Sequence, residues 1–297
     1  MKPIESVAVV SKRSSREALQ TAQELCEWLV RRGLAVALDE AARRVRRPPG
    51  VTSFDPDADY DLVVVLGGDG TLLSVARGLQ RPVPVFGVNL GRLGFLTEVG
   101  RKDLYPSLIQ VLGGAYRIED RSLFAVTLTR ASGPPATYSV LNDAVIAKSA
   151  LARIIELSMR VGGSNVARLR ADGLIISTPT GSTAYNLSAG GPILSPQLPV
   201  AVITPICPHT LSLRPLVVPD SERIEITLET SREEVYLTLD GQEGTSLAYR
   251  DTVAVERSDA RVGLVKISGR TFYDNLRGKL RWGDLAGQSP ETATTDG

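Results

Sequence analysis

The chain has 297 residues, of which 43% are apolar and 23% are charged, and its net charge is +1. These values are ordinary for a globular protein and leave room for two domains. They provide no strong positive field for nucleic acid or an anionic membrane, and no apolar run approaches the ~20 residues that span a bilayer. We therefore expect no nucleic-acid partner and no membrane partner.

Residue types that build metal and hydrolase sites are scarce. The chain has two cysteines far apart, Cys26 and Cys207, and one histidine, His209. A disulfide framework, a protein-built metal site and a Ser-His hydrolase are therefore disfavoured. The first residues lack the basic and apolar regions of a signal peptide, so we expect a cytoplasmic protein.

The first 118 residues alternate apolar strand-like runs with segments of helical periodicity. This alternation predicts a doubly wound α/β domain. The predicted helices cover 16–32, 71–77 and 102–112, and the predicted strands cover 7–10, 34–38, 62–66 and 83–88.

A glycine-rich loop follows the strand predicted at 62–66. It contains Gly67, Gly68, Asp69, Gly70 and Thr71 and leads directly into a predicted helix. Glycines let a ligand approach the backbone, and the N–H groups at a helix start favour anions. The loop is typical of a phosphate site with one carboxylate beside it, although Gly-Asp is also common turn chemistry.

Two further loops lie near this edge of the predicted sheet. A second glycine-rich turn, which begins at Asn89, follows the strand predicted at 83–88, where open α/β sheets bind ligands. Arg43, Arg44, Arg46 and Arg47 precede Pro48. They indicate either a solvated helix end or a loop that visits an anionic ligand.

The sequence changes character after residue 118. Short strand-like segments separated by turn residues indicate a β-rich, sandwich-like second domain over 119–268. A final amphipathic helix is predicted at 271–282, and residues 285–297 have the composition of a disordered tail. The predicted strands are 122–129, 138–147, 154–161, 167–176, 224–228, 235–239, 252–256 and 262–267.

Hydroxyl groups are concentrated in one segment of this second half. Thr178, Thr180, Ser182 and Thr183 lie close together and are followed by Tyr185. Such groups can bind ribose and phosphate oxygens, and an aromatic ring can stack on a base. Thr183 is also expected to cap a helix over 184–189, which would not need four hydroxyls.

Two Asp-containing pairs complete the set of candidates. Asn142 and Asp143 interrupt the strand predicted at 138–147 and offer acceptors for the two hydroxyls of a ribose, although a plain strand-end turn is equally compatible with the sequence. Asp240 and Gly241 have the sequence of a hairpin turn.

Together these segments resemble the bacterial NAD kinase family, in the family's order, over about residues 5–282. The block from Thr178 to Tyr185 is highly specific, whereas the glycine loop alone also resembles lipid kinases and phosphofructokinases. The matching segments are 67–71, 89–95, 142–143, 170–173, 178–185, 190–196 and 208–216.

The resemblance implies phosphoryl transfer from ATP to the 2′-hydroxyl of the adenosine ribose of NAD, which gives NADP. Asp69 would orient or deprotonate that hydroxyl, and Asn142 and Asp143 would hold the adenosine. Asp143 stands where many members have Glu, and its side chain, one methylene shorter, would shift the ribose contact or bring in a water. Gly67, Gly68, Gly70 and Thr71 would line the phosphate loop, and Asn89 is a further binding residue. The remaining residues carried over are Tyr185 and Ser188 at the adenine, Thr183, Ala184 and Asp172 near the nicotinamide half, and Arg170 at the dinucleotide phosphate.

The resemblance also implies an architecture and partners. Residues 1–118 with 269–284 would form the α/β domain, because the last helix returns to the first domain in the family. The active site would lie between the domains of a homodimer or homotetramer. ATP and NAD would be the substrates. The sequence has no Walker motif, so the glycine-rich loop would hold the donor phosphates. It has no carboxylate cluster that suggests a metal site, so Mg²⁺ would arrive on ATP.

Two other readings are compatible with parts of the sequence. A diacylglycerol or sphingoid lipid kinase would explain residues 62–71 but not the hydroxyl-rich segment. A dinucleotide sensor or an NAD-dependent oxidoreductase would need a Gly-x-Gly-x-x-Gly pattern, which fails after Thr71.

Overall fold

A computed structural model describes residues 3–39, 47–79, 81–91, 94–210, 212–267, 269 and 271–281. One compact unit extends to Ile267, and a second unit begins at Ser268. The arginines predicted to visit an anionic ligand, Arg43, Arg44 and Arg46, lie outside the described residues. No helix within the described ranges is long and apolar enough to cross a membrane.

The first part of the chain forms a parallel sheet, as the alternating pattern predicts. Its strands pair side by side in the order β5, β4, β1, β2, β3, and every pair is parallel. The central β4 is buried along its whole length, which explains its continuous apolar sequence. The strands are β1 (Ser6–Ser11), β2 (Ala35–Leu38), β3 (Val51–Ser53), β4 (Leu62–Leu66), β5 (Val85–Asn89) and β6 (Val99–Gly100), which pairs with β5.

Helices cover both faces of this sheet, so the fold is doubly wound. The helix α1 (Arg16–Val30) and the helix α3 (Leu104–Leu112), which follows the short turn η2 (Arg101–Asp103), pack on the same apolar cluster as Val7 and Val9. The helix α2 (Asp69–Gly78) packs on the opposite cluster with Ala8 and Val10. Alternate residues of β1 therefore face the two helix layers.

The second part of the chain is a sandwich of two β layers with one apolar core. One layer continues the first sheet through β7 (Arg117–Thr129), β8 (Ala136–Val140), β10 (Ile155–Val161), β11 (Ser164–Ala171), β15 (Ile224–Leu228) and β18 (Thr252–Lys266). The other layer is a six-stranded sheet of β14 (Leu216–Pro219), β13 (Val200–Ile206), β12 (Gly173–Ser177), β9 (Asp143–Lys148), β16 (Val235–Leu239) and β17 (Glu243–Leu247).

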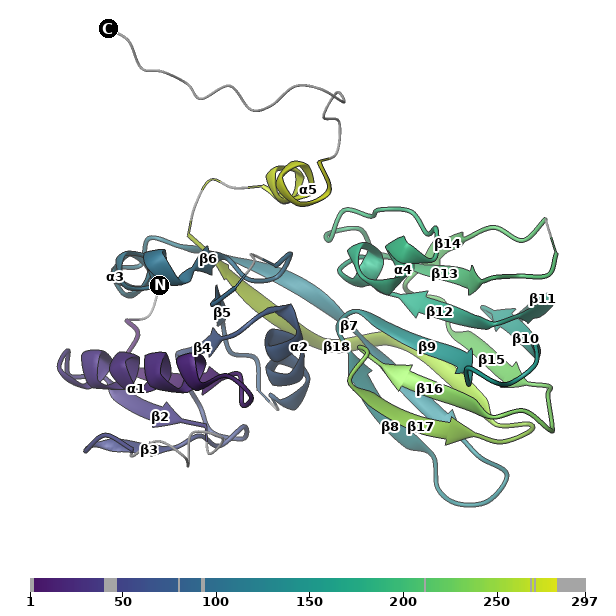
Figure 1. The fold of residues 1–297 in the computed structure, drawn as a ribbon, viewed down its shortest axis with the longest axis horizontal. Helices are drawn as coiled ribbons and strands as arrows, with labels where there is room; N and C mark the ends of the chain where they lie inside the picture. Colours follow the sequence, from purple (N-terminus) through teal and green to yellow (C-terminus); the bar gives the residue numbers. More distant parts are fainter. Residues whose placement is uncertain are drawn as a thin grey trace, which may run out of the picture. The chain divides into compact units, whose positions relative to one another are not determined.

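Two long strands connect the α/β part to the sandwich. β18 pairs with β15 in the sandwich and, near its other end, with β5 of the parallel sheet, and β7 accompanies it throughout (Figure 1). The sequence predicts two strands at 252–256 and 262–267, whereas the structure has one strand with a register shift between Arg257 and Arg261. The boundary at 118/119 stays a prediction, since β7 and β18 belong to both parts.

Two other predicted strands are each divided in the structure. The predicted strand 138–147 becomes β8 and β9, which pair with different neighbours on either side of Asn142. The predicted strand 167–176 becomes β11 and β12, which belong to different layers. The hairpin turn predicted at 240–241 is confirmed, and Gly162 and Gly163 form another hairpin turn; all four residues have positive φ.

The second unit contains the predicted final helix, α5 (Phe272–Leu280). Thr271 caps it, and Asp274 completes a capping box with the Thr271 backbone. The prediction that this helix returns to the first domain remains untested, and the predicted disordered tail, 285–297, lies outside the described residues.

A buried ion pair ties the end of β18 to the segment before β6. Lys266 Nζ donates to Glu98 Oε2 at 2.7 Å, and the two side chains are 6% and 5% exposed. Lys266→Met should lower the free energy of unfolding by about 3–5 kcal/mol, because it removes the cation paired with a buried carboxylate. Urea unfolding measures the change. Adding Glu98→Gln should recover part of the loss, whereas Arg81→Met, which breaks the exposed pair with Asp59, should cost under about 1 kcal/mol. Equal losses in Lys266→Met and Arg81→Met would contradict this account.

Candidate active site

The carboxylate of Asp69 is fixed by the segment that follows β5. Its oxygens accept hydrogen bonds from the backbone N–H groups of Phe95 at 2.6 Å, Leu96 at 3.2 Å and Thr97 at 3.2 Å. The Thr97 hydroxyl donates a fourth bond at 3.2 Å. Asp69 is the first residue of α2, so the carboxylate is an oriented acceptor at the carboxyl edge of the parallel sheet.

The loop that fixes Asp69 depends on Asn89 and on close packing. Asn89 is 5% exposed, accepts from Gly91 N at 2.8 Å and donates to Thr97 Oγ1 at 3.2 Å. A Cβ added at Gly94 would lie 1.6 Å from Asp69 Oδ1. Asn89 therefore shapes the loop in this structure, and Gly94 is needed for the close approach of the carboxylate.

A cavity of about 430 Å³ lies beside the glycine-rich loop and is lined by Gly68, Gly70 and Thr71. Lys12 and Arg13, which directly follow β1, line the same cavity together with Phe54 and Gln242. The sequence interpretation missed these two cations. Their place just after a parallel strand, at the same sheet edge as the loop, was the signal that could have found them.

Gly67 is not among the residues that line this cavity, and its role is in packing. A Cβ added there would lie 2.4 Å from the Thr71 hydroxyl oxygen. Of the predicted phosphate-loop residues, Gly68, Gly70 and Thr71 therefore face the cavity directly.

Asn142 directly precedes β9 and Asp143 is its first residue, and Asp240 holds the backbone of both. The Asp240 carboxylate accepts from the backbone N–H groups of Leu141 at 3.0 Å, Asn142 at 2.7 Å and Asp143 at 3.1 Å. Asp240 N donates to Asp143 O at 2.9 Å. The hairpin residue Asp240 therefore shapes a segment almost one hundred positions earlier, which its turn sequence does not reveal.

The carboxylates of Asp143 and Asp240 lie near each other, and their protonation is coupled. Asp143 is 3% exposed, and burial, reinforced by the nearby charge of Asp240, raises its pKa to about 7. Burial also raises the pKa of Asp240, while the three N–H donors and Arg77 act in the opposite direction. Asp143 therefore changes its charge near neutral pH.

This raised pKa should make stability depend on pH. The folded state binds the Asp143 proton more tightly than the unfolded state, so stability is lost as pH rises from about 4 to about 7. In the wild type, the free energy of unfolding should fall by an amount on the order of 1–3 kcal/mol between pH 5 and 8, and Asp143→Asn should abolish this fall. Urea unfolding without ligand measures both profiles. Asp59→Asn, at an exposed carboxylate, serves as a control and should keep the wild-type dependence of stability on pH. An unchanged profile in Asp143→Asn would contradict this.

Most of the hydroxyl-rich segment is engaged by the fold itself. Thr178 Oγ1 donates to Leu141 O at 2.6 Å, and Ser182 Oγ donates to Pro179 O at 2.6 Å. Thr178 and Ser182 are fully buried. A Cβ added at Gly181 would lie 2.2 Å from Asn142 O, so the segment packs directly against the Asn142 turn.

The predicted helix cap at Thr183 is wrong. The residues Gly181–Thr183 form a short 3-10 turn (η3), and the helix α4 (Tyr185–Ser188) begins after Ala184 without a side-chain cap. Thr183 Oγ1 instead reaches back to Thr180 O at 3.4 Å. Tyr185 and Ser188 are exposed, while Thr183 and Ala184 are half-buried, so all four are accessible to a ligand.

Asp172 directly precedes β12, at the end opposite Ser177, and Arg170 lies near the end of β11. Ser177 pairs with Asp143, whereas Gly173 pairs with Ala147, so Asp172 is about 16 Å along the strand from the Asp143 end. Asp172 lies 3.7 Å from Lys148 Nζ, and Arg170 Nε lies 3.4 Å from Glu156. The structure therefore does not bring Arg170 and Asp172 together with Asp143.

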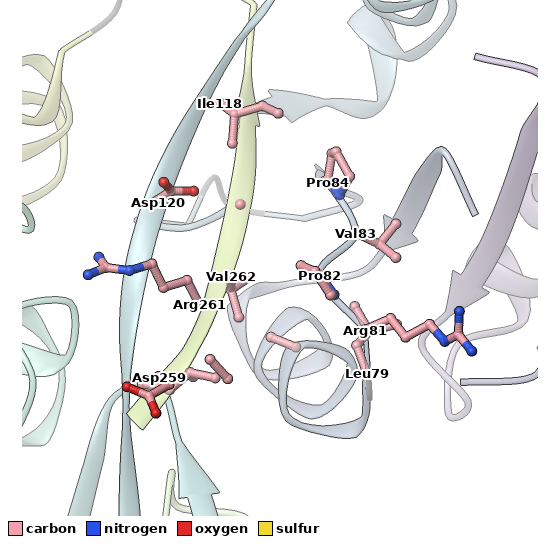
Figure 2. A pocket seen from close by; sticks show the side chains of 14 residues that line it. Leu79, Arg81, Pro82, Val83, Pro84, Ile118, Asp120, Asp259, Arg261 and Val262 are labelled. Carbon is pink, nitrogen blue, oxygen red and sulfur yellow. The ribbon is translucent and has the colours of Figure 1, made fainter. Parts of the chain in front are cut away.

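A larger cavity, of about 730 Å³, lies beyond the C-terminal end of α2 (Figure 2). Its lining is mainly apolar and includes Leu79, Pro82, Ile118 and Val262. None of the predicted site residues lines it. The smaller cavity, by contrast, is lined by Gly68, Gly70 and Thr71 of the glycine-rich loop that contains Asp69.

The described residues do not contain a group of three or more His, Cys, Asp or Glu side chains that could hold a metal ion. The negative charge near the glycine-rich loop comes from single carboxylates, and Asp39, which lines the cavity, lies 3.8 Å from Arg13. The residues present fit a polyanion better than a bare cation.

Family models and curated relatives both match this chain to NAD kinases. The model of the ATP-NAD kinase N-terminal domain matches residues 7–116, and that of the ATP-NAD kinase C-terminal domain matches 141–267. The NAD kinase of Trichlorobacter lovleyi is 48% identical over 284 residues, which are 95% of this chain and 100% of the relative. That of Geotalea daltonii is 45% identical over 283 residues, with the same coverage.

Solved structures agree in fold. An NAD kinase from Archaeoglobus fulgidus in complex with ATP is 28% identical, with a TM-score of 0.72, over 93% of this chain and 98% of the other. Yeast NADH kinase complexed with NADH gives a TM-score of 0.89 over 96% of this chain and 89% of the other, at 24% identity.

Proposed function

The chain belongs to the ATP-NAD kinase family, and on this premise we propose that its own residues transfer the γ-phosphoryl group of ATP to the 2′-hydroxyl of the adenosine ribose of NAD. The observation that supports this most is the Asp69 carboxylate, oriented by four donors beside a cavity lined by glycines, Thr71 and two cations. Phosphoryl transfer depends mainly on such positioning and on charge stabilisation.

The donor site is the cavity beside the glycine-rich loop. The backbone around Gly68 and Gly70 lets the phosphates approach closely, and Gly68 caps the N-terminus of α2, where N–H groups favour anions. Lys12 and Arg13 neutralise part of the phosphate charge. The structure of the similar NAD kinase from Archaeoglobus fulgidus contains ATP, which supports a nucleoside triphosphate as the phosphoryl donor.

The acceptor site is formed by the Asn142 turn and the segment packed on it. Asn142 and Asp143 bind the adenosine ribose, Tyr185 and Ser188 contact the adenine, and Thr183 and Ala184 line the path toward the nicotinamide half. The close packing of Gly181 on Asn142 supports a single continuous surface. Asn89 acts through the loop that fixes Asp69, since its side chain is occupied there.

Asp69 accepts the proton of the attacking hydroxyl. A bond forms between the ribose 2′-oxygen and the γ-phosphorus, the bond to the β-phosphate oxygen breaks, and ADP leaves. A sugar hydroxyl is a weak acid, so one oriented acceptor takes its proton late in the transfer. Mg²⁺ carried by ATP would supply charge neutralisation at the phosphates.

The positions of Arg170 and Asp172 lead us to propose a homodimer or homotetramer in which these residues reach NAD bound mainly by another copy. The position of Asp172 before the far end of β12, and of Arg170 near the end of β11, supports this arrangement. Mixing two inactive variants, Asp69→Asn and Asp172→Ala, should restore part of the activity if sites are shared between copies. Light scattering that shows a monomer, or no recovery of activity after mixing, would contradict the proposed oligomer.

The cytoplasmic location stays a prediction.

A coupled assay tests the proposed activity against its alternatives. The purified chain is incubated with ATP and Mg²⁺ and with NAD, NADH or diacylglycerol, and NADP is detected with an NADP-specific dehydrogenase. The proposal requires NADP formation from NAD. Phosphorylation of the lipid alone would indicate a lipid kinase, binding of NAD without turnover would indicate a sensor, and a change in nicotinamide absorbance without ATP would indicate an oxidoreductase.

A further inference from the structure

Two separate sheets supply the parts of the proposed active site. Asp69 begins α2, which follows β4 of the parallel sheet, whereas Asp143 begins β9 of the six-stranded sheet and Asn142 directly precedes it. The reacting groups can align only if α2 keeps a fixed position relative to the start of β9. A contact between these two elements would therefore affect the rate of transfer.

The turn between β16 and β17 makes such a contact at both ends of α2. In the first turn of the helix, Gln242 Nε2 donates to Gly70 O at 2.5 Å. In its last turn, Arg77 Nη2 donates to Gln242 Oε1 at 3.3 Å and to Glu243 Oε1 at 3.1 Å. Arg77 Nε lies 3.6 Å from Asp240 Oδ2.

The same turn holds the start of β9. The carboxylate of Asp240 accepts from the three successive backbone N–H groups of residues 141–143, as described above. Asp240 therefore lies between the helix that carries Asp69 and the backbone that carries Asn142 and Asp143. The Arg77 and Asp240 side chains are 9% and 0% exposed, so little solvent screens their attraction.

Arg77 contacts Asp240 from the end of α2 that is remote from Asp69. Arg77 Nε is buried, has no hydrogen-bond partner, and lies just beyond hydrogen-bonding distance of Asp240. At this atom Arg77 therefore holds Asp240 by charge attraction, which little solvent screens. Arg77 is at the opposite end of α2 from Asp69, and it does not line the cavity beside the glycine-rich loop.

We propose that Arg77, acting through Asp240, is a positioning residue that sets α2 and Asp69 against the ribose site at Asn142 and Asp143. This inference rests on the proposed function, because it assumes that Asp69 acts on a ribose held there. A displacement of about 1 Å between reacting groups can lower a rate by about 10²-fold. The inference therefore concerns alignment during transfer and not the binding of either substrate.

The test compares Arg77→Met, which keeps the apolar stem, with Arg77→Lys, which keeps the charge. In Arg77→Met, kcat for NADP formation should fall by about 10- to 100-fold, with KM for NAD and for ATP within about 3-fold of wild type. Arg77→Lys should recover part of kcat. Because water can replace a misplaced acceptor, the ratio of ATP hydrolysed to NADP formed should rise in Arg77→Met. Arg81→Met, which breaks only an exposed pair shortly after α2, is the matched control and should behave as wild type.

Several outcomes would overturn the inference. One is a folded Arg77→Met protein, checked by circular dichroism and thermal unfolding, whose kcat is within 2-fold of wild type. Another is a change in KM while kcat and the ratio of ATP hydrolysed to NADP formed stay unchanged. If Arg77→Met does not fold, Arg77→Lys and Asp240→Asn provide the same comparison. A wild-type kcat and a wild-type ratio of ATP hydrolysed to NADP formed in both variants would overturn the inference. A wild-type chain that forms no NADP would instead overturn the proposed function itself.

Discussion

Replacing Asp69 with asparagine is expected to lower kcat for NADP formation by about 10²–10⁴-fold, the range that a general base contributes. Asparagine is nearly isosteric with aspartate but cannot take the proton of the attacking hydroxyl. NAD affinity, measured by calorimetry, should stay close to that of wild type, because Asp69 acts on one hydroxyl and the adenosine is held elsewhere. Wild-type turnover in this variant would remove the assignment.

The structure adds a second effect that the experiment must separate. The Asp69 carboxylate also holds the loop at 95–97 through four hydrogen bonds, and an amide nitrogen cannot accept them. Thr97→Val is the matched control, because it removes the Thr97 hydroxyl, which also contacts Gly94 N and Asn89, and keeps the carboxylate. Asp69→Asn should lose at least about 10-fold more kcat than Thr97→Val. Equal losses would assign Asp69 to loop structure alone.

Replacing Gly94 with alanine is expected to have the second largest effect. The new Cβ would lie 1.6 Å from Asp69 Oδ1 and 2.2 Å from its Cγ, so the carboxylate or the loop must move. We expect a loss of about 1–3 kcal/mol in the free energy of unfolding from overpacking, and a fall in kcat on the order of 10²-fold from displacement of Asp69. Urea unfolding and steady-state kinetics measure the two effects.

Gly100→Ala is the matched control for Gly94→Ala. A Cβ at Gly100 would meet nothing within 4 Å, and its φ of −85° suits alanine. This variant should keep wild-type kcat and change stability by less than about 1 kcal/mol. A Gly94→Ala protein with the kcat of Gly100→Ala would show that the close approach of Gly94 to Asp69 has no role in catalysis.

The parallel sheet and its glycine-rich loop could be predicted because they depend on local sequence. β4 is a continuous apolar run, and α2 begins directly after the glycines, so burial and backbone freedom are both visible in adjacent residues. β7 and β18 were harder to predict, because whether two strand-like segments join across a register shift depends on their partners. The division of 138–147 at Asn142 has the same cause.

The candidate site could be predicted only in part. Asp240 has the sequence of an ordinary turn, and the role of its carboxylate depends on backbone groups about one hundred residues away. The density of hydroxyls indicated binding, yet Thr178 and Ser182 are used internally, because buried hydroxyls must find partners wherever the chain folds. Lys12 and Arg13 were missed because their place depends on strand order.

The product of the wild-type reaction tests the central claim most directly. The chain is incubated with NAD, ATP and Mg²⁺, and phosphorus NMR follows the reaction to completion. We predict one ADP for each NADP and a new phosphomonoester on the 2′-oxygen of the adenosine ribose. ADP without NADP, or a phosphate at any other position, would contradict the account.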